Sequence, residues 1–397
     1  MKKPGQARAG GAPRSDPEAV AVCALASVPG VGAATLARIE QRFQSLQEAV
    51  RQGPARLLAC EDLELDPAAR HYLSRGPDLP ALGTWALQTA HKAGARVVLL
   101  GEDQYPGRLR RMSTPPRLLY VRGHLPAAAK RVAVVGSREV DEPGRDLAQS
   151  FGDGLARAGV EVVSGGARGI DTAAHEGALW GEGRSIAVLG SGIDVPYPAE
   201  NAPLFDRLAG GAGAVISELP PGAGPQRSNF PRRNRIVAGL ADAVVVVRAQ
   251  AGSGALITAR LALRCGTKVF AVPGDPANPR AEGPNVLLRD GQAQVATGPA
   301  DVLLALGWPV PEVLKAPPAF PPADLHTWVP GPGTSDRAVI DEEGVRLWRL
   351  LDGRTPAHVD DLALRAQIPA REALGKLAEL ELKGMAVQRP GKYFLRR

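Results

Sequence analysis

The amino-acid sequence predicts an α/β fold, a Rossmann-like doubly wound parallel sheet, and two features of its middle region indicate this. Between Gly83 and Trp308, short apolar runs alternate with segments of helical length, among them Gly144–Arg157 and Thr258–Arg264. Such runs suit a parallel sheet covered on both faces, and such helices suit right-handed crossovers. The predicted strands are Arg96–Leu100, Leu118–Val121, Val132–Val135, Val160–Val163, Ile186–Leu189, Ala214–Ile216, Ala243–Val247 and Lys268–Ala271.

Glycine- or arginine-bearing turns after apolar strands are the third feature of this region. They read VAVVGSR, VVSGGARGID, NFPRRNRIVAG and AGSGALITA. The carboxyl ends of parallel strands meet at one edge, where backbone N–H groups and guanidinium groups can bind anionic oxygens. No turn carries the lysine of a phosphate-binding loop or a complete dinucleotide fingerprint. The edge is therefore predicted to hold phosphates without the groups that would hydrolyse them.

The segments before this region predict a tail and a small helical domain. Residues 1–15 are basic and rich in Gly, Pro and Ala, so we expect a disordered tail, followed by a helix–hairpin–helix (SAM-like) domain over 16–78. Gly30 and Gly32 lie between two helices of this domain. They would let a phosphate approach the N–H groups that begin the second helix. A tight turn that serves packing alone explains the pattern equally well.

The segments after this region predict a linker and a winged helix. Prolines crowd the stretch from 309 to 333, which predicts an extended linker over 309–338. Over 339–397, three helices precede a two-stranded wing, namely Gly344–Leu351, His358–Arg365, Pro369–Lys383, Met385–Arg389 and Lys392–Leu395. The wing carries Arg389 and Lys392 without an acid, but the third helix mixes acids and bases, which does not suit a major-groove reader. A DNA-reading wing and a protein-interaction wing both fit.

Composition narrows the classes of function. A formal net charge of +7 favours an anionic partner, nucleic acid first. Cys23, Cys60 and Cys265 lie far apart without a CxxC motif, and the six histidines form no HExxH motif. We therefore expect no disulfide framework, no metal and no cofactor. No apolar run reaches membrane-spanning length and the N-terminus lacks a signal-peptide core, so a cytoplasmic protein is expected.

A series of motifs resembles one known family. YPGRL, PPRLLYVRG, VAVVGSR, SGGARGIDTAAHEGAL, IAVLGSGIDVPYPAEN, ISELPPG, NFPRRNRIVAGLADAVVVVRA, SGALITARLA and VFAVPGD follow one another between Gly83 and Gly298. In this order they resemble the DNA-processing protein A family (DprA, also called Smf), and the flanking domains fit the layout of many members. The resemblance implies a cytoplasmic protein that binds and protects single-stranded DNA during natural transformation. It also implies loading of RecA recombinase past the single-strand-binding protein, and a homodimer formed through the Rossmann domain.

Two positions depart from the family pattern. Gly166 in SGGARG stands where the family commonly has Leu, and Arg248 in VVVVRA stands where it commonly has an acid. The glycine is expected to loosen a turn. The arginine is expected to add a positive charge near the edge of the sheet, with an effect on binding that the sequence leaves open.

Two of the turns supply the first candidate phosphate ligands. In Gly136-Ser137-Arg138 the glycine permits a sharp turn, the serine and exposed N–H groups can donate to a phosphate, and the arginine can bind two of its oxygens. In Gly165-Gly166-Ala167-Arg168, consecutive glycines expose N–H groups that can form an anion nest. Plain strand-to-helix turns with surface arginines are the alternative. For Asp171 and His175 we expect structural roles, a cap or ion pair with Arg168 and packing respectively, rather than catalysis.

The densest basic cluster surrounds Phe230. An aromatic ring among arginines suits a single strand, because bases stack on the ring while cations follow the backbone. By resemblance, Arg227 corresponds to a phosphate contact and Phe230 to a stacking residue, although Phe230 could be a core anchor and Asn234 a buried loop residue. Arg235 is the best candidate for a buried ion pair. Further candidates are Arg232, Arg233, Asn234 and the helix start at Gly252 and Ser253, whereas Gly190 and Tyr197 look like scaffolding.

The sequence thus favours a non-catalytic single-stranded DNA-binding protein and recombination mediator. One alternative is a phosphoribohydrolase-like enzyme, which would need a Glu beside a Gly-Gly-x-Gly-Thr helix start. Here that segment reads Ala-Gly-Ser-Gly-Ala over 251–255. The other alternative is a duplex-reading regulator acting through the winged helix, and the weakly basic character of that domain argues against it.

Overall fold

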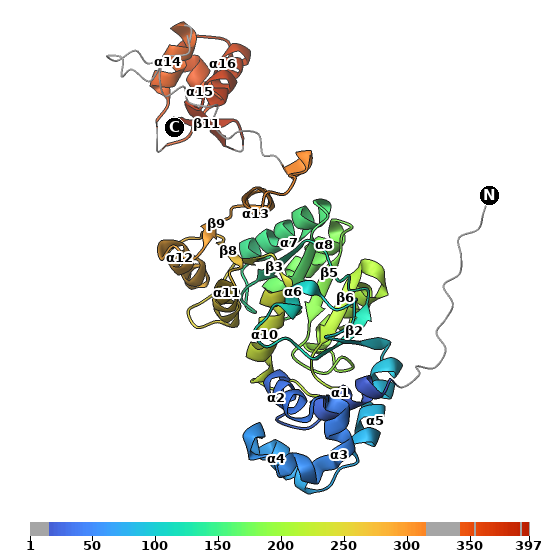
Figure 1. Cartoon of the computed structure of the whole chain (residues 1–397). Helices are drawn as coiled ribbons and strands as arrows, with labels where there is room; N and C mark the ends of the chain where they lie inside the picture. The colour runs from blue at the N-terminus through green and yellow to red at the C-terminus, as the bar shows by residue number, and fades with distance from the viewer. Residues whose placement is uncertain (1–15, 315–341, 353–354, 390, 397) are drawn as a thin grey trace, which may run out of the picture. The chain divides into compact units, whose positions relative to one another are not determined.

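The computed structural model describes residues 16–314, 342–352, 355–389 and 391–396. The predicted tail over 1–15 and most of the predicted linker lie outside these residues. The chain divides into two compact units, residues 1–317 and 318–397. In the first unit, a nine-stranded sheet lies between helices, and a helical region precedes it (Figure 1). Within the described ranges, none of the helices combines the length and the apolar character that a membrane span requires.

The sheet is mostly parallel, as predicted, with the strand order β1-β2-β6-β5-β4-β3-β7-β8-β9. Two differences from the prediction concern strands at or next to its edges. β2 runs antiparallel to both of its neighbours, β1 and β6, because the segment that joins β1 to β2 contains only the four-residue helix α6 (Gly107–Arg110), which is too short for a crossover helix. β9 has only two residues, both exposed, and carries no apolar pattern. The strands are β1 Ala95–Leu99, β2 Leu118–Gly123, β3 Arg131–Val135, β4 Glu161–Ser164, β5 Ser185–Val188, β6 Gly213–Ser217, β7 Ala243–Val246, β8 Lys268–Ala271 and β9 Gln294–Val295.

Helices cover both faces of the sheet, so its central strands are buried on both sides. In β3, Val132 and Val134 face the core beneath α7 and α8, whereas Ala133 and Val135 face the core beneath α10 and α11. This two-sided burial explains why the central strand sequences are mostly apolar. The helices are α7 Glu142–Arg157, α8 Ile170–Trp180, α9 Ala202–Arg207, α10 Asn229–Leu240, α11 Gly254–Arg264, α12 Glu282–Arg289 and α13 Pro299–Ala305, with short turns η2 Ala199–Asn201, η3 Leu208–Ala212, η4 Pro279–Ala281 and η5 Glu312–Leu314.

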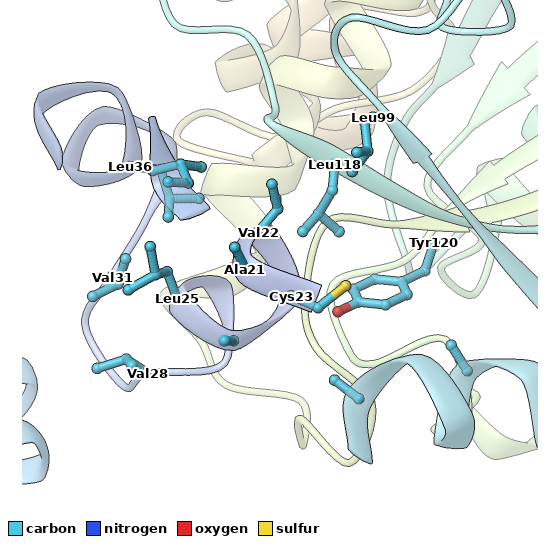
Figure 2. Close-up of a cluster of buried hydrophobic side chains, with 14 of the residues drawn as sticks. Ala21, Val22, Cys23, Leu25, Val28, Val31, Leu36, Leu99, Leu118 and Tyr120 are labelled. Carbon is cyan, nitrogen blue, oxygen red and sulfur yellow. The ribbon is translucent and has the colours of Figure 1, made fainter. Parts of the chain in front are cut away.

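The N-terminal helical region shares a hydrophobic core with the sheet. Cys23 lies beside Tyr120 of β2, and Leu118 and Leu99 belong to the same cluster (Figure 2). Burial raises the pKa of the Cys23 thiol to about 12. This common core ties the predicted hairpin to the sheet. The helices of the region are α1 Pro17–Ala26, α2 Ala33–Phe43, α3 Leu46–Leu58, α4 Pro67–Ser74 and α5 Leu79–Lys92, with η1 at Glu61–Leu63.

The second unit is a winged helix, as predicted. Leu347, Leu362, Leu377 and Phe394 are fully buried in its own core. A two-residue strand, β10, completes a sheet of order β10-β12-β11 and was too short to predict. The elements are α14 Glu342–Leu350, β10 Ala357–His358, α15 Val359–Ala366, α16 Ala370–Leu382, β11 Ala386–Arg389 and β12 Tyr393–Arg396.

Candidate nucleic-acid interface

A cleft of about 910 Å³ opens at the carboxyl ends of β3, β4 and β7. We call it the strand-end cleft. The first turns of α10 and α11 also border it, as the parallel topology requires. Predicted site residues from four separate chain segments meet here, namely Gly136, Ser137, Arg138, Gly165, Arg227, Phe230, Arg233, Asn234 and Ser253.

Phe230, in the first turn of α10, forms an aromatic platform in this cleft. Its ring is half-buried and packs on Gly190, where an added Cβ would lie 2.8 Å from the ring. The Arg138 guanidinium lies over the ring, 5.0 Å from its centroid, and the Tyr197 ring is 5.6 Å away. The ring is therefore anchored on one side and accessible on the other. Tyr197 also lines the cleft and is 42 % exposed, so it is a candidate stacking residue rather than scaffolding alone.

Four features of the strand-end cleft can bind phosphate. Arg138 and Arg227 are exposed cations that line it. Ser253 lies at the start of α11, where its buried Oγ has no hydrogen-bond partner among the described residues. The first turn of α11 contains no acid, so the positive end of its dipole is not neutralised locally. Two exposed cations, a hydroxyl and a helix N-terminus together suit a phosphodiester backbone.

The predicted anion nest is occupied by the chain's own carboxylate. The backbone N–H groups of Gly165 and Ala167 donate to Asp171 Oδ2 at 3.1 and 3.3 Å, and the Ser137 N–H donates to the carbonyl of Arg248 at 2.6 Å. The expectation that these N–H groups are open to a phosphate is therefore wrong. The physical reason is that a buried carboxylate needs donors, and the glycine-rich turn supplies them. Asp171 orders the loop, as expected, but does not pair with Arg168.

Arg233 and Asn234 fasten the turns together. The Arg233 guanidinium donates to the carbonyl oxygens of Gly165 and Val188, and its Nε donates to Asn234 Oδ1 at 3.2 Å. Asn234 Nδ2 in turn donates to the carbonyl of Gly254 at 3.1 Å. Both residues are buried, and burial lowers the pKa of Arg233 to about 10. Although both border the cleft, their polar groups bond within the protein. For Asn234 this agrees with the alternative of a buried loop residue.

His175 is packed inside the protein, as expected. Its ring is fully buried, and its Nδ1 lies 2.7 Å from Ser185 Oγ. Burial, with the nearby charge of Arg233, lowers the pKa of His175 to about 3. Among the described residues, no group of three or more His, Cys, Asp or Glu side chains is placed to hold a metal ion.

Four of the residues predicted to bind DNA at the sheet edge lie outside the strand-end cleft. Arg168 is exposed and forms an ion pair with Glu200. Gly252 precedes α11 with a φ of +75°. Gly166 has a φ of +65°, and a Cβ added there would lie 2.7 Å from the Phe205 ring. The Gly166 turn is therefore closely packed, not loosened. Arg232 lines a different cleft, beside the predicted hairpin.

Arg248 places its charge near the edge of the sheet, just beyond β7, as expected, but that charge is buried. It is 7 % exposed, its Nη1 donates to the carbonyl of Val247 at 3.2 Å, and its Nε lies 3.8 Å from Asp141 Oδ1. Its carbonyl receives the Ser137 N–H. Arg248 thus lies behind the turn that carries Arg138. Arg235 is partly buried and forms an ion pair with Glu218, as predicted.

A second cleft, of about 380 Å³, lies beside the predicted hairpin. We call it the hairpin cleft. Gly30 and Gly32 line it, and so does Arg232, whose Nη2 would lie 2.6 Å from a Cβ added at Gly32. Gly30 has a φ of +79°, which favours glycine at that position. The structure therefore places Arg232 over the hairpin.

Known proteins share both the sequence and the fold. Residues 96–307 match the family described as DNA recombination-mediator protein A, and residues 317–392 match the DprA winged helix domain. The chain is 40 % identical over 316 residues to Protein Smf of Escherichia coli (strain K12), covering 78 % of each chain. It is 34 % identical over 348 residues to the putative DNA processing protein DprA of Mycobacterium tuberculosis (strain ATCC 25618 / H37Rv), covering 84 % of this chain and 83 % of that one.

A solved structure agrees with these matches. The X-ray structure of DNA processing protein A from Streptococcus pneumoniae superimposes with a TM-score of 0.60 at 32 % identity, covering 71 % of this chain and 95 % of that one. The matched residues include the whole strand-end cleft, which extends from Val135 to Thr258. The chain belongs to the DNA recombination-mediator protein A family.

Proposed function

We propose that this protein binds single-stranded DNA in the strand-end cleft without catalysing a reaction on it. The protein also protects the bound strand and helps to load RecA recombinase onto it during natural transformation and recombination. Membership of a family described as a DNA recombination mediator supports this second part. We also propose that the protein is cytoplasmic, that it forms a homodimer through the sheet-bearing unit, and that it contacts the single-strand-binding protein.

The observation that carries the proposal is the Phe230 platform with its neighbouring cations. The ring is held by Gly190 and offers its free part to the cleft, with the Arg138 guanidinium 5.0 Å from its centroid. Arg227 lines the same cleft. A base can stack on such a ring only when it is not already stacked within a duplex, and stacking accepts every base. The site therefore favours single strands without a strong sequence preference.

The enzyme alternative requires a free carboxylate in the cleft. Two carboxylates line it, those of Asp171 and Glu139. Asp171 is buried and accepts two backbone N–H groups, and Glu139 directly follows Arg138, away from the helix start at which such enzymes place their acid. Neither position suits a phosphoribohydrolase.

The duplex-reading alternative depends on cations of the winged helix. There, the Arg396 guanidinium stacks on Trp348 at 3.6 Å from the ring centroid, so it contributes to packing within this unit. The strand-end cleft offers more groups suited to nucleic acid than this wing does. Deleting residues 339–397 tests the alternative, and we expect single-strand binding to persist.

The test follows RecA filament assembly on a single strand already coated with single-strand-binding protein. We expect the wild type to accelerate assembly, and Phe230→Ala and Arg138→Ala to lose the acceleration. Arg56→Ala is the matched control, because Arg56 is exposed on α3 and lines neither cleft. Acceleration by correctly folded Phe230→Ala at the wild-type rate would contradict the proposal.

A further inference from the structure

The two clefts share a wall, the segment from Gly224 to Arg232 that leads into α10. Successive residues of this wall face opposite ways, since Gln226, Asn229 and Arg232 line the hairpin cleft. Arg227 and Phe230 line the strand-end cleft. The N-terminus of α10 therefore lies between the two clefts. Its first turn contains no acid, so the wall carries positive potential toward both.

Among the charged side chains that line the hairpin cleft, Arg232 is exposed and forms no ion pair with a described residue. Arg117 is paired with Glu40, and Glu218 is paired with Arg235. No carboxylate of the described residues lies within ion-pair distance of Arg232, which is exposed above Gly32. Gly32 begins α2 without a side-chain cap, and the first turn of α2 contains no acid. Arg232 and the uncapped N–H groups of α2 thus converge on one side of this cleft.

An unexplained aromatic ring lies on the other side of the hairpin cleft. Trp85 of α5 is 47 % exposed although it is among the largest apolar side chains of the protein. A Cβ added at Gly222 would lie 3.8 Å from its ring, so the loop over 220–224 borders it. That loop is held in place, because the Gly222 N–H donates to Asp194 Oδ1 at 2.8 Å. Trp85 therefore lies beside a fixed wall and an open space.

We propose that the hairpin cleft is a second nucleotide subsite, in which a base stacks on Trp85 while a phosphate binds Arg232 and the start of α2. The inference rests on the proposed function, because the strand that fills this subsite is the one bound at Phe230. The strand passes from the strand-end cleft across the positive N-terminus of α10. A single strand binds where an aromatic ring can stack on a base and a cation can contact the backbone, and the hairpin cleft offers Trp85 and Arg232 on its two sides. The phosphate contact predicted at Gly30 and Gly32 would then be made by the same strand that binds at Phe230.

The test compares oligo-dT of about 5 and about 15 nucleotides, near the two ends of common single-strand site sizes. Fluorescence anisotropy gives the Kd of each for the full chain. We expect Trp85→Ala to weaken the long oligonucleotide by about fivefold or more, the lower end of one base–aromatic stack, and to leave the short one unchanged. Arg232→Ala should likewise weaken only the long oligonucleotide, through the loss of a phosphate contact. Trp85→Phe should restore most of the affinity because it keeps a ring. Arg56→Ala and Trp180→Ala are controls, since both residues are exposed and line neither cleft.

The results separate this inference from the proposed function. Long-oligonucleotide binding that survives Trp85→Ala and Arg232→Ala unchanged, or that weakens equally for both lengths, would overturn the second subsite. Failure of Phe230→Ala and Arg138→Ala to weaken either length would instead overturn the proposed function. If Trp85→Ala does not fold, Arg232→Glu decides the same question, because its charge reversal should weaken only the long oligonucleotide.

Discussion

Replacing Arg233 by Met tests whether this arginine holds the strand-end cleft together. The substitution keeps most of the length of the side chain and removes its charge and donors. It leaves the carbonyl oxygens of Gly165 and Val188 without these donors. It also removes the positive charge that opposes the rise in the pKa of Asp171 caused by burial.

The expected loss is large because Arg233 and the groups around it are buried. Arg233 is 7 % exposed, as is Asp171, whose charge it offsets. Each buried carbonyl oxygen left without its donor typically costs about 1–3 kcal/mol, so the two together are a substantial part of the roughly 5–15 kcal/mol that stabilises a domain. An exposed arginine on the same helix, Arg232, should change the free energy of unfolding by no more than about 0.5 kcal/mol when replaced by Met.

Urea denaturation followed by circular dichroism measures these differences. We expect Arg233→Met to lower the midpoint strongly and Arg232→Met to leave it in place. The double variant Asp171→Asn/Arg233→Met should lose less than the sum of its single substitutions, with a coupling of about 0.5–3 kcal/mol. An Arg233→Met protein as stable as Arg232→Met would refute the structural role.

Three further predictions concern the burial of His175, the packing at Gly166 and the charge of Arg138. Because burial lowers the pKa of folded His175 to about 3 while the unfolded side chain titrates near 6.5, the unfolded state binds the extra proton between these values. The free energy of unfolding should therefore fall between pH 6.5 and 5 by about 2 kcal/mol more in the wild type than in His175→Gln. Urea denaturation at several pH values measures this, and equal pH profiles of the two proteins would contradict it. Gly166→Ala places a methyl group 2.7 Å from the Phe205 ring at a φ of +65°, so thermal unfolding should show a loss of about 2 kcal/mol or more, whereas Gly101→Ala, which meets nothing, should be neutral. Arg138→Ala should reduce the slope of log K against log salt for oligo-dT by about 0.7, the value for one single-strand phosphate, and an unchanged slope would exclude that contact.

The central sheet could be predicted because its physical signal is local. Each residue of β3 is buried, so its apolar run from Val132 to Val135 directly reflects helices on both faces. The direction of β1 and β2 depends on pairing between distant segments, and β9 has too few residues to form a pattern. These edge features lie beyond what a single sequence shows.

The turns of the site were predicted, but not how each polar group is used. Consecutive helical residues point about 100° apart, so Arg232 and Arg233 face a cleft and the core respectively. Their sequence neighbourhood is the same, and only the packing distinguishes them. Similarly, the glycine pattern around Gly165 indicated open N–H groups, whereas the fold brings Asp171 to them.

The most direct test of the central claim is the affinity of the Phe230→Ala protein for labelled oligo-dT, set against a matched duplex and the wild type. One base–aromatic stack contributes about 1–3 kcal/mol, so the account predicts single-strand binding weakened by about five- to 150-fold. Phe230→Tyr should remain close to the wild type, and unchanged thermal unfolding should show that each variant is folded. Single-strand affinity equal to that of the wild type in a folded Phe230→Ala protein would contradict the account.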